Sequence, residues 1–106
     1  MTDPIEKLRE YGYELPTPKA PVASYAPVTR SGNLLFVSGQ ISSNDTGVVT
    51  GLLGENMNVV QGANAAELAA VSVLAQIVHN GGVKLDDIKR ILKLTVLVAS
   101  TPEFTE

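Results

Sequence analysis

The stretch that decides the fold reads Leu34-Leu35-Phe36-Val37-Ser38-Gly39-Gln40. Its first four residues are all apolar, which predicts a short strand buried on both faces. Ser31-Gly32-Asn33 precedes this strand and predicts a tight turn, because glycine and asparagine both tolerate a positive φ. An earlier strand is expected over Tyr25 to Arg30, at an edge of the sheet, because Pro27 cannot donate to a ladder of strand hydrogen bonds. Ser38-Gly39-Gln40 then ends the apolar run abruptly.

One long helix is predicted over Val59 to Asn80. Asn58 and Gln61 give it a start that resembles a capping box, and Gly81 and Gly82 close it. At about 100° per residue its apolar residues fall on one stripe, which we expect to face the sheet. The members of this stripe are Val59, Ala63, Ala66, Ala70, Val73, Leu74 and Ile77. The opposite face carries, among polar residues, Leu68, Val71 and Ala75.

Shorter elements are expected on both sides of these. They are a helix from its N-cap Asp3 and Pro4 to Gly12, a proline-rich extended segment over Leu15 to Pro27, a short strand near Val48–Leu53, a turn at Leu85-Asp86-Asp87 capped by Asp86 or Asp87, and a last strand over Ile88 to Val98. Ser100 or Thr101 with Pro102 has the pattern of a helix start. Because no helix follows it, we expect the domain to be truncated at Glu106.

The order strand, strand, short strand, helix, strand is typical of an α+β fold. One helix covers only one face of a sheet, and the second strand is apolar on its other face as well. We therefore expect a further subunit to cover that face. We interpret residues 1–106 as a single domain, with an N-terminal helix and proline-rich extension in 1–23 and the core in 24–106.

The composition excludes several classes of function. The chain has 106 residues, a formal charge of −3, no cysteine and one histidine, His79. Without cysteine it cannot form a disulfide, a thiolate nucleophile, a zinc finger or an iron–sulfur cluster, and one histidine cannot build a multi-histidine site, so we expect no metal. The acidic charge and the 5% aromatic content argue against nucleic acid as a partner.

No membrane segment is expected. Met1 to Glu10 is polar and of mixed charge, without the apolar core of a signal peptide. No window approaches the roughly 18 uninterrupted apolar residues that indicate a membrane-spanning helix. We therefore predict a cytoplasmic protein without a membrane partner.

Two short motifs invite a catalytic interpretation. Asp45-Thr46-Gly47 is the triplet of dimeric aspartic proteases, but polar residues precede it where an apolar strand is needed, which favours a loop turn. Ser38 before Gly39 suggests the nucleophile of a serine hydrolase, but Phe36 stands where that motif requires glycine. The only candidate base, His79, is expected at a helix C-terminus, where its charge would favour the dipole.

The remaining candidate site combines Tyr25 with Ser38-Gly39-Gln40. A tyrosine on an edge strand and a small-residue turn after a buried strand can line one cleft, and backbone groups at Ser38 and Gly39 then become available to a ligand. The alternative is that Tyr25 packs in the core and that Ser38-Gly39-Gln40 only terminates the strand.

At these residues the chain resembles the YjgF/Rid/endoribonuclease L-PSP family. The resemblance covers most of the sequence from Tyr25 to Glu106. The runs that carry it are Tyr25-Ala26-Pro27-Val28, Gly32 through Ile41, the alanine-rich helix Ala63–Val78, Asp87-Ile88-Lys89, Lys93 through Val98, and Glu103-Phe104.

The resemblance implies a chorismate-mutase-like α+β fold that forms a homotrimer, with sheets inside and clefts between subunits. It implies an enamine and imine deaminase, which hydrolyses intermediates such as 2-aminoacrylate to a 2-keto acid and ammonia without a cofactor. Tyr25 would close the pocket, and Ser38, Gly39 and Gln40 would bind the substrate. The family's arginine and glutamate would lie on strands beyond Glu106, and neither Arg30 nor Arg90 stands at the arginine's position.

Two other functions remain open. One is a trimeric domain of the same family that binds a small imine, enamine or keto-acid ligand without turnover. The other is the ribonuclease activity of the family's older name, which the acidic charge and the single histidine, His79, argue against.

Overall fold

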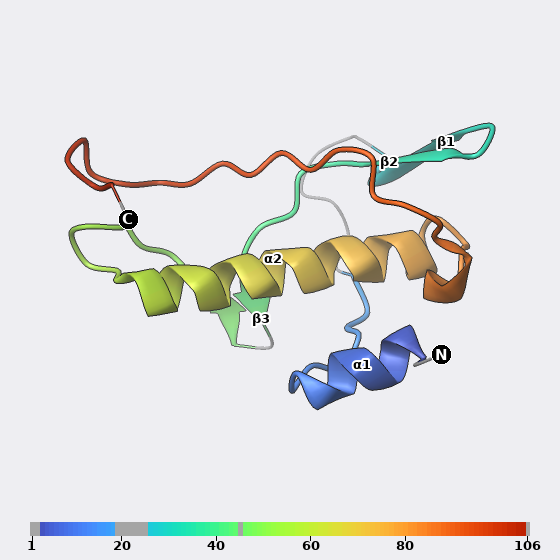
Figure 1. Ribbon diagram of the computed structural model, residues 1–106, viewed down its shortest axis with the longest axis horizontal. Coiled ribbons are helices and arrows are strands. Elements are labelled where there is room, and N and C mark those ends of the chain that lie inside the picture. Colours follow the sequence, from blue (N-terminus) through green and yellow to red (C-terminus); the bar gives the residue numbers. More distant parts are fainter. Residues whose placement is uncertain (1–2, 19–25, 45, 106) are drawn as a thin grey trace.

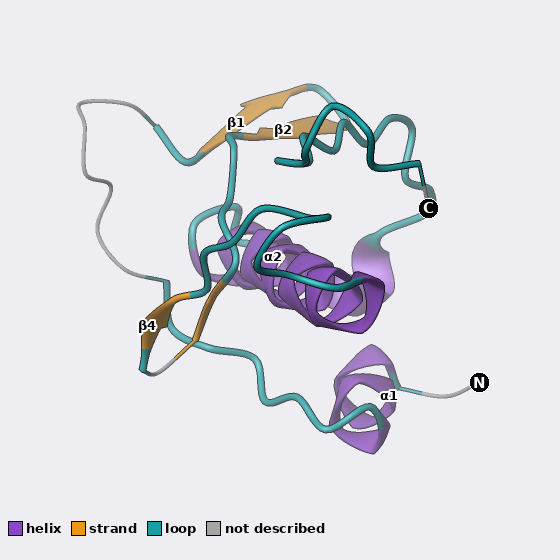
Figure 2. Cartoon of the chain, turned by 90° about the vertical axis from the view of Figure 1, so that its left-hand side faces the viewer, coloured by secondary structure: helices purple, strands orange, loops and turns teal. Residues whose placement is uncertain are grey.

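The chain is an α+β domain in the computed structural model, which describes residues 3–18, 26–44 and 46–105. Its elements are α1 (Pro4–Glu10), β1 (Val28–Ser31), β2 (Leu34–Val37), β3 (Ser43–Asn44), β4 (Gly47–Val48), α2 (Val59–His79) and the 3-10 helix η1 (Leu85–Asp87). In both overall views α2 lies in the middle, with α1 on one side of it and the β1–β2 hairpin on the opposite side (Figures 1 and 2).

The predicted tight turn joins β1 to β2. The strands are antiparallel, and Ser31 pairs with Leu34 across the two-residue loop. Gly32 has a φ of 59°, a conformation that costs glycine little and other residues more. The predicted first strand is confirmed from Val28 onward, whereas Tyr25 lies outside the described residues.

Only one face of β2 is covered. Leu34 and Phe36 are 44% and 58% exposed, whereas Leu35 and Val37 are half-buried. Within one chain this strand is therefore open on the face that we expect a further subunit to cover, and the cover by that subunit stays a prediction. The reason is that α2 contacts β2, while no element of the described chain covers the face that carries Phe36.

The predicted boundaries of α2 are confirmed within one residue. The Gln61 N–H donates to Asn58 Oδ1 at 2.8 Å, and the Asn58 N–H donates to Gln61 Oε1 at 2.9 Å, which completes a capping box. At the other end the N–H groups of Asn80 and Gly81 both donate to the carbonyl oxygen of Gln76. A Cβ on Gly81 would lie 2.5 Å from the Ile77 carbonyl oxygen, so the chain needs glycine there.

The buried side of α2 differs from the predicted stripe. The buried residues of the helix are Val71, Ala75, Gln76 and Ile77, whereas four members of the predicted stripe, Val59, Ala63, Ala66 and Ala70, are exposed. The helix is apolar on more than one side, so apolar spacing does not determine which side packs. The packing partners decide instead: Leu53 lies against Gly62, and Gln40 contacts Gln76. These helix positions are 76 − 62 = 14 residues apart, nearly four turns, so they share one face.

The predicted strand over Ile88 to Val98 is not formed. The segment is extended, and in Figure 1 it runs from orange to red along the length of α2 without joining β2. The large apolar side chains exposed on it are Ile91, Leu92, Leu94, Val96, Leu97 and Val98. A strand needs a neighbour that completes its hydrogen bonds. Such pairing begins only at Ala99. The Leu53 N–H donates to the Ala99 carbonyl oxygen at 3.0 Å, and the Thr101 N–H donates to the Leu53 carbonyl oxygen at 2.9 Å.

The strand expected near Val48–Leu53 is shorter than predicted. Gly47–Val48 pairs with Ser43–Asn44, and Leu53 makes isolated bridges instead. Between the strands the Thr46 N–H and hydroxyl both donate to Asn44 Oδ1. Thr46 therefore lies in the hairpin loop, as the loop interpretation predicts, whereas Gly47 begins β4 and Asp45 lies outside the described residues.

The N-terminal helix begins as predicted, because the Asp3 carboxylate accepts from the Ile5 N–H at 3.0 Å. Beyond it, the Tyr13 hydroxyl donates to the Glu67 carboxylate and so ties this segment to α2. The turn at Leu85–Asp87 is a 3-10 helix without a side-chain cap, so the capping role predicted for Asp86 or Asp87 is wrong. Within the described ranges, no helix has the length and apolar character needed to cross a membrane.

Candidate functional site

The turn Ser38-Gly39-Gln40 leaves the sheet directly after β2. The Ser38 N–H donates to the Pro27 carbonyl oxygen at 2.9 Å, one position beyond the Val28–Val37 pair of the hairpin. Pairing with β1 thus continues through Ser38 and then ends. Ser38 is half-buried and Gly39 is exposed, so the turn lies at the boundary between packed and open parts of the molecule.

Side-chain amides attach this turn to α2. Gln40 Nε2 donates to the Ser38 carbonyl oxygen at 3.3 Å and to Ser38 Oγ at 3.4 Å. Gln76 Nε2 donates to Gln40 Oε1 at 3.4 Å, and Asn80 Nδ2 donates to Gln76 Oε1 at 2.6 Å. The turn is therefore held by its own glutamine and by the last two turns of the central helix.

Gly39 leaves open space beside the turn. Apart from its two neighbours in the chain, no described residue has an atom within 4 Å of a Cβ built on Gly39, and its φ lies outside the left-handed region. Neither backbone strain nor packing against these residues therefore demands glycine at this position. A small residue here gives a ligand room to approach the Ser38 hydroxyl and the turn's backbone.

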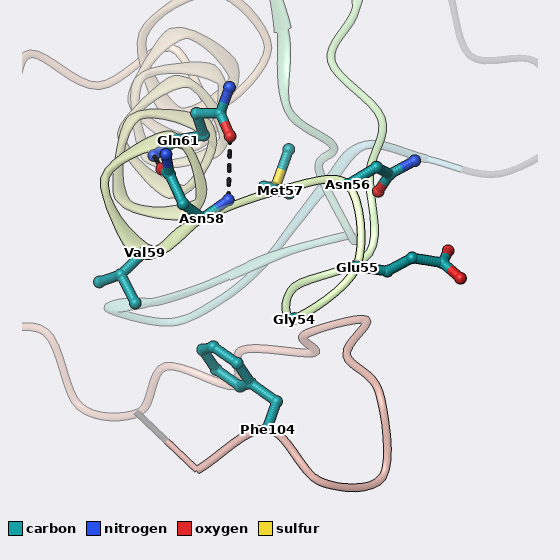
Figure 3. A pocket seen from close by; sticks show the side chains of 8 residues that line it. All are labelled: Gly54, Glu55, Asn56, Met57, Asn58, Val59, Gln61 and Phe104. Atoms are coloured by element: carbon teal, nitrogen blue, oxygen red, sulfur yellow. Dashed lines mark hydrogen bonds between the residues drawn. The ribbon is translucent and has the colours of Figure 1, made fainter.

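A separate hollow of about 460 Å³ lies at the other end of α2. Figure 3 shows it between the loop before the helix and the ring of Phe104. Its lining residues are Gly54, Glu55, Asn56, Met57, Asn58, Val59, Gln61 and Phe104. Val59 and Gln76 are 17 residues apart on α2, roughly 25 Å at about 1.5 Å per residue, so this hollow and the turn at Ser38 are distinct places.

Comparison with known proteins identifies the chain's relatives. The family model for endoribonuclease L-PSP matches residues 17–106. The chain belongs to the endoribonuclease L-PSP family. Protein TCP17 of Trypanosoma cruzi is a relative that is 42% identical over 100 residues, which cover 93% of this chain and 62% of that protein. The match confirms the resemblance carried by Ser38-Gly39-Gln40 and the neighbouring runs.

Two solved structures share the fold. A protein of unknown function from Agrobacterium tumefaciens matches with a TM-score of 0.84 and 42% identity, covering 95% of this chain and 60% of that one. A candidate endoribonuclease from Shewanella oneidensis matches with a TM-score of 0.77 and 32% identity, covering 85% of this chain and 60% of that one. The predicted chorismate-mutase-like α+β fold is confirmed, and the chain spans about three fifths of the length of each relative.

Of the predicted site residues of this L-PSP chain, the structure brings three together. Ser38, Gly39 and Gln40 form one turn against α2. Tyr25, the fourth, lies outside the described residues. That these residues bind a substrate stays a prediction, because no ligand is present to test it.

The charged candidates lie elsewhere. Arg30 Nε donates to the Gly32 carbonyl oxygen at 2.9 Å, at the opposite end of the hairpin from Ser38. Arg9 Nε lies 3.2 Å from the carboxylate oxygen Oε1 of Glu14, beside α1. His79 is the exposed last residue of α2, and no hydrogen bond joins it to Ser38 among the described side chains. Among the residues that the structure describes, no group of three acidic, histidine or cysteine side chains is arranged to hold a metal ion.

Two residues of the site were missed from the sequence. Gln76 and Asn80 were expected only as members of a helix, yet their amides continue the hydrogen bonds of the turn. One signal was present: Gln76 interrupts the apolar run Val73–Val78, and a polar group at a buried helix position needs hydrogen-bond partners.

Proposed function

We propose that this chain forms part of an enamine and imine deaminase, which hydrolyses 2-aminoacrylate-like intermediates to 2-keto acids and ammonia. The observation that carries the proposal is the turn after β2, where the half-buried Ser38 stands beside the open space at Gly39. Membership in the endoribonuclease L-PSP family supports it, because this turn is one of the runs on which the resemblance to deaminases rests.

The reaction needs little chemistry from the protein beyond binding and placing water. Water adds to the C=N carbon of the imine, and the displaced π electron pair goes to nitrogen, which takes a proton. The resulting carbinolamine expels ammonia as its hydroxyl proton leaves, which gives the 2-keto acid. No electrons are exchanged with a cofactor. In this scheme the Ser38 hydroxyl and the backbone of Gly39 hold oxygen atoms of the substrate.

The assay couples the protein to a serine dehydratase, which releases 2-aminoacrylate from serine. We expect the protein to speed the appearance of pyruvate beyond the rate at which the intermediate hydrolyses in buffer. The control replaces the protein with the same amount of heat-denatured protein. Equal rates with and without the native protein would contradict the proposal.

A second function is a binding domain without turnover. The observation that favours it is the position of Arg9 and Arg30, which are engaged with Glu14 and Gly32 rather than turned toward the site. A substrate carboxylate at Ser38 would therefore lack these two cations. This alternative predicts that the protein binds pyruvate but does not accelerate its formation, and measurable turnover would rule it out.

We also propose that the protein acts as a homotrimer. The exposed apolar side chains of Phe36 and of residues 91–98 support this, because such a surface is typical of an interface between subunits. Light scattering should give three times the mass of one chain. A monomeric mass at micromolar concentration would contradict the proposal.

A further inference from the structure

The hydrogen bonds behind the turn after β2 all run in one direction. Asn80 donates to Gln76, Gln76 donates to Gln40, and Gln40 donates to Ser38. Each glutamine accepts at its oxygen and donates from its nitrogen, so reversing one amide would reverse the next as well. We call this chain of three donating side chains and Ser38 the amide relay.

Gln76 is the fixed member of the amide relay. It is 6% exposed and lies between apolar neighbours on α2. Its backbone carbonyl oxygen accepts from the backbone N–H groups of Asn80 and Gly81 at 2.9 and 3.0 Å, which fixes its backbone at the helix end. A buried amide is costly unless both of its ends are bonded. The side chain of Gln76 is therefore held by Asn80 on one side and can be satisfied by Gln40 on the other.

The direction of the amide relay decides what Ser38 offers to a ligand. Ser38 Oγ accepts a hydrogen bond from Gln40 at 3.4 Å. A hydroxyl that accepts from behind keeps its own proton for donation. The group presented beside Gly39 is then a donor, which suits an oxygen of a carboxylate or carbonyl and not an N–H group.

We propose that Gln76 is a positioning residue: through Gln40 it sets the Ser38 hydroxyl as a donor toward a keto-acid or imine-acid oxygen. This inference rests on the proposed function in one respect, that the turn after β2 is the ligand site. It adds a residue of α2, 36 positions away from Gln40 in the sequence, to the binding machinery.

The substitution Gln76→Glu tests the direction of the relay. When protonated, the new carboxyl can accept from Asn80 and donate to Gln40, as the amide does. When ionised, it can only accept, so Gln40 must turn its nitrogen toward α2 and its oxygen toward Ser38. Burial away from water favours the protonated form and raises the pKa of the new carboxyl above the usual value of about 4.3.

The readout is the affinity for pyruvate across mildly acid to mildly alkaline pH. We expect Gln76→Glu to match the wild type at acid pH and to bind roughly three- to ten-fold more weakly at alkaline pH, the effect of losing about one hydrogen bond. Gln76→Met should bind more weakly by the same factor at every pH. His79 is common to all variants, so any contribution it makes cancels in the comparison.

The matched control is Gln61→Met, which removes a hydrogen-bonded glutamine from the first turn of the same helix. It should lower thermal stability and leave pyruvate affinity at the wild-type value. If Gln76→Glu follows the wild type at every pH, or Gln61→Met weakens binding as much as Gln76→Met, the positioning role is wrong.

A ligand-free measurement separates this inference from the proposed function. The backbone amide signals of Ser38 and Gly39 in Gln76→Glu should move with pH, relative to the wild type, as the new carboxyl ionises. If the wild type fails to bind pyruvate, the proposed function fails while this test still decides the relay. Unmoved amide signals in a folded Gln76→Glu protein would overturn the relay itself.

Discussion

Gly39 is the residue at which the candidate site is most open. A Cβ added there meets no atom within 4 Å from described residues other than its two neighbours, and the backbone is not in the left-handed region. At this scale the sequence was informative about the turn, because Ser38-Gly39-Gln40 ends an apolar run. For Gln76 the sequence indicated only that a buried amide needs partners, since Gln40 lies 36 positions away and no local pattern identifies it as the partner.

The substitution Gly39→Val should therefore separate binding from folding. We expect pyruvate affinity to fall at least ten-fold because the isopropyl group fills the space beside Ser38, while the free energy of unfolding changes by less than about 0.5 kcal/mol. Calorimetric titration and urea denaturation measure the two quantities. The control Ala66→Val introduces the same isopropyl side chain on the exposed face of α2. Unchanged affinity in Gly39→Val would place the ligand elsewhere.

Among the elements, α2 shows which features a sequence can predict. Its start depends on Asn58 and Gln61, which bond to each other's backbone across three residues, so a local pattern was sufficient. Its buried side depends on Leu53 and Gln40, which approach from other parts of the chain. Because the alanine residues of the helix lie on several of its sides, apolar periodicity could not distinguish the face that packs from the face that is exposed.

The cap should contribute measurably to stability. Asn58→Ala removes the acceptor for the Gln61 N–H, and we expect a loss of about 1 kcal/mol in the free energy of unfolding. Urea denaturation followed by circular dichroism measures it. Asn64→Ala, an exposed position within the same helix, should be neutral or slightly stabilising because alanine is the better helix former. Equal losses in the two variants would show that the cap has no special role.

For the whole molecule, the contacts between distant segments are the least predictable part. The segment over Ile88 to Val98 has the pattern of a strand, but a strand forms only beside another strand, and none of the four described strands pairs with it. The contact between the N-terminal segment and α2 could not be predicted from the sequence either, because Tyr13 and Glu67 are separated by 54 residues.

This last contact gives a prediction for alkaline pH. The hydrogen bond to Glu67 raises the pKa of Tyr13 above its usual value of 10.0, with smaller contributions from desolvation and from the charge of Glu67. A raised pKa means that the bond stabilises the fold fully below pH 10 and is lost as the pH rises through the folded-state pKa. Spectrophotometric titration of the tyrosines should show an ionisation step above the usual pKa of about 10, and this step should be absent in Tyr13→Phe. If that variant keeps the step at high pH, the step does not come from the contact between Tyr13 and Glu67, and the prediction is wrong.

The proposed ligand site at the turn after β2 can be tested by a nuclear magnetic resonance titration of the isotope-labelled protein with pyruvate. We predict that the backbone signals of Ser38, Gly39 and Gln40 shift, together with the side-chain amide signal of Gln76. Shifts confined to the hollow that contains Asn58 and Phe104, or no shifts at all, would contradict it.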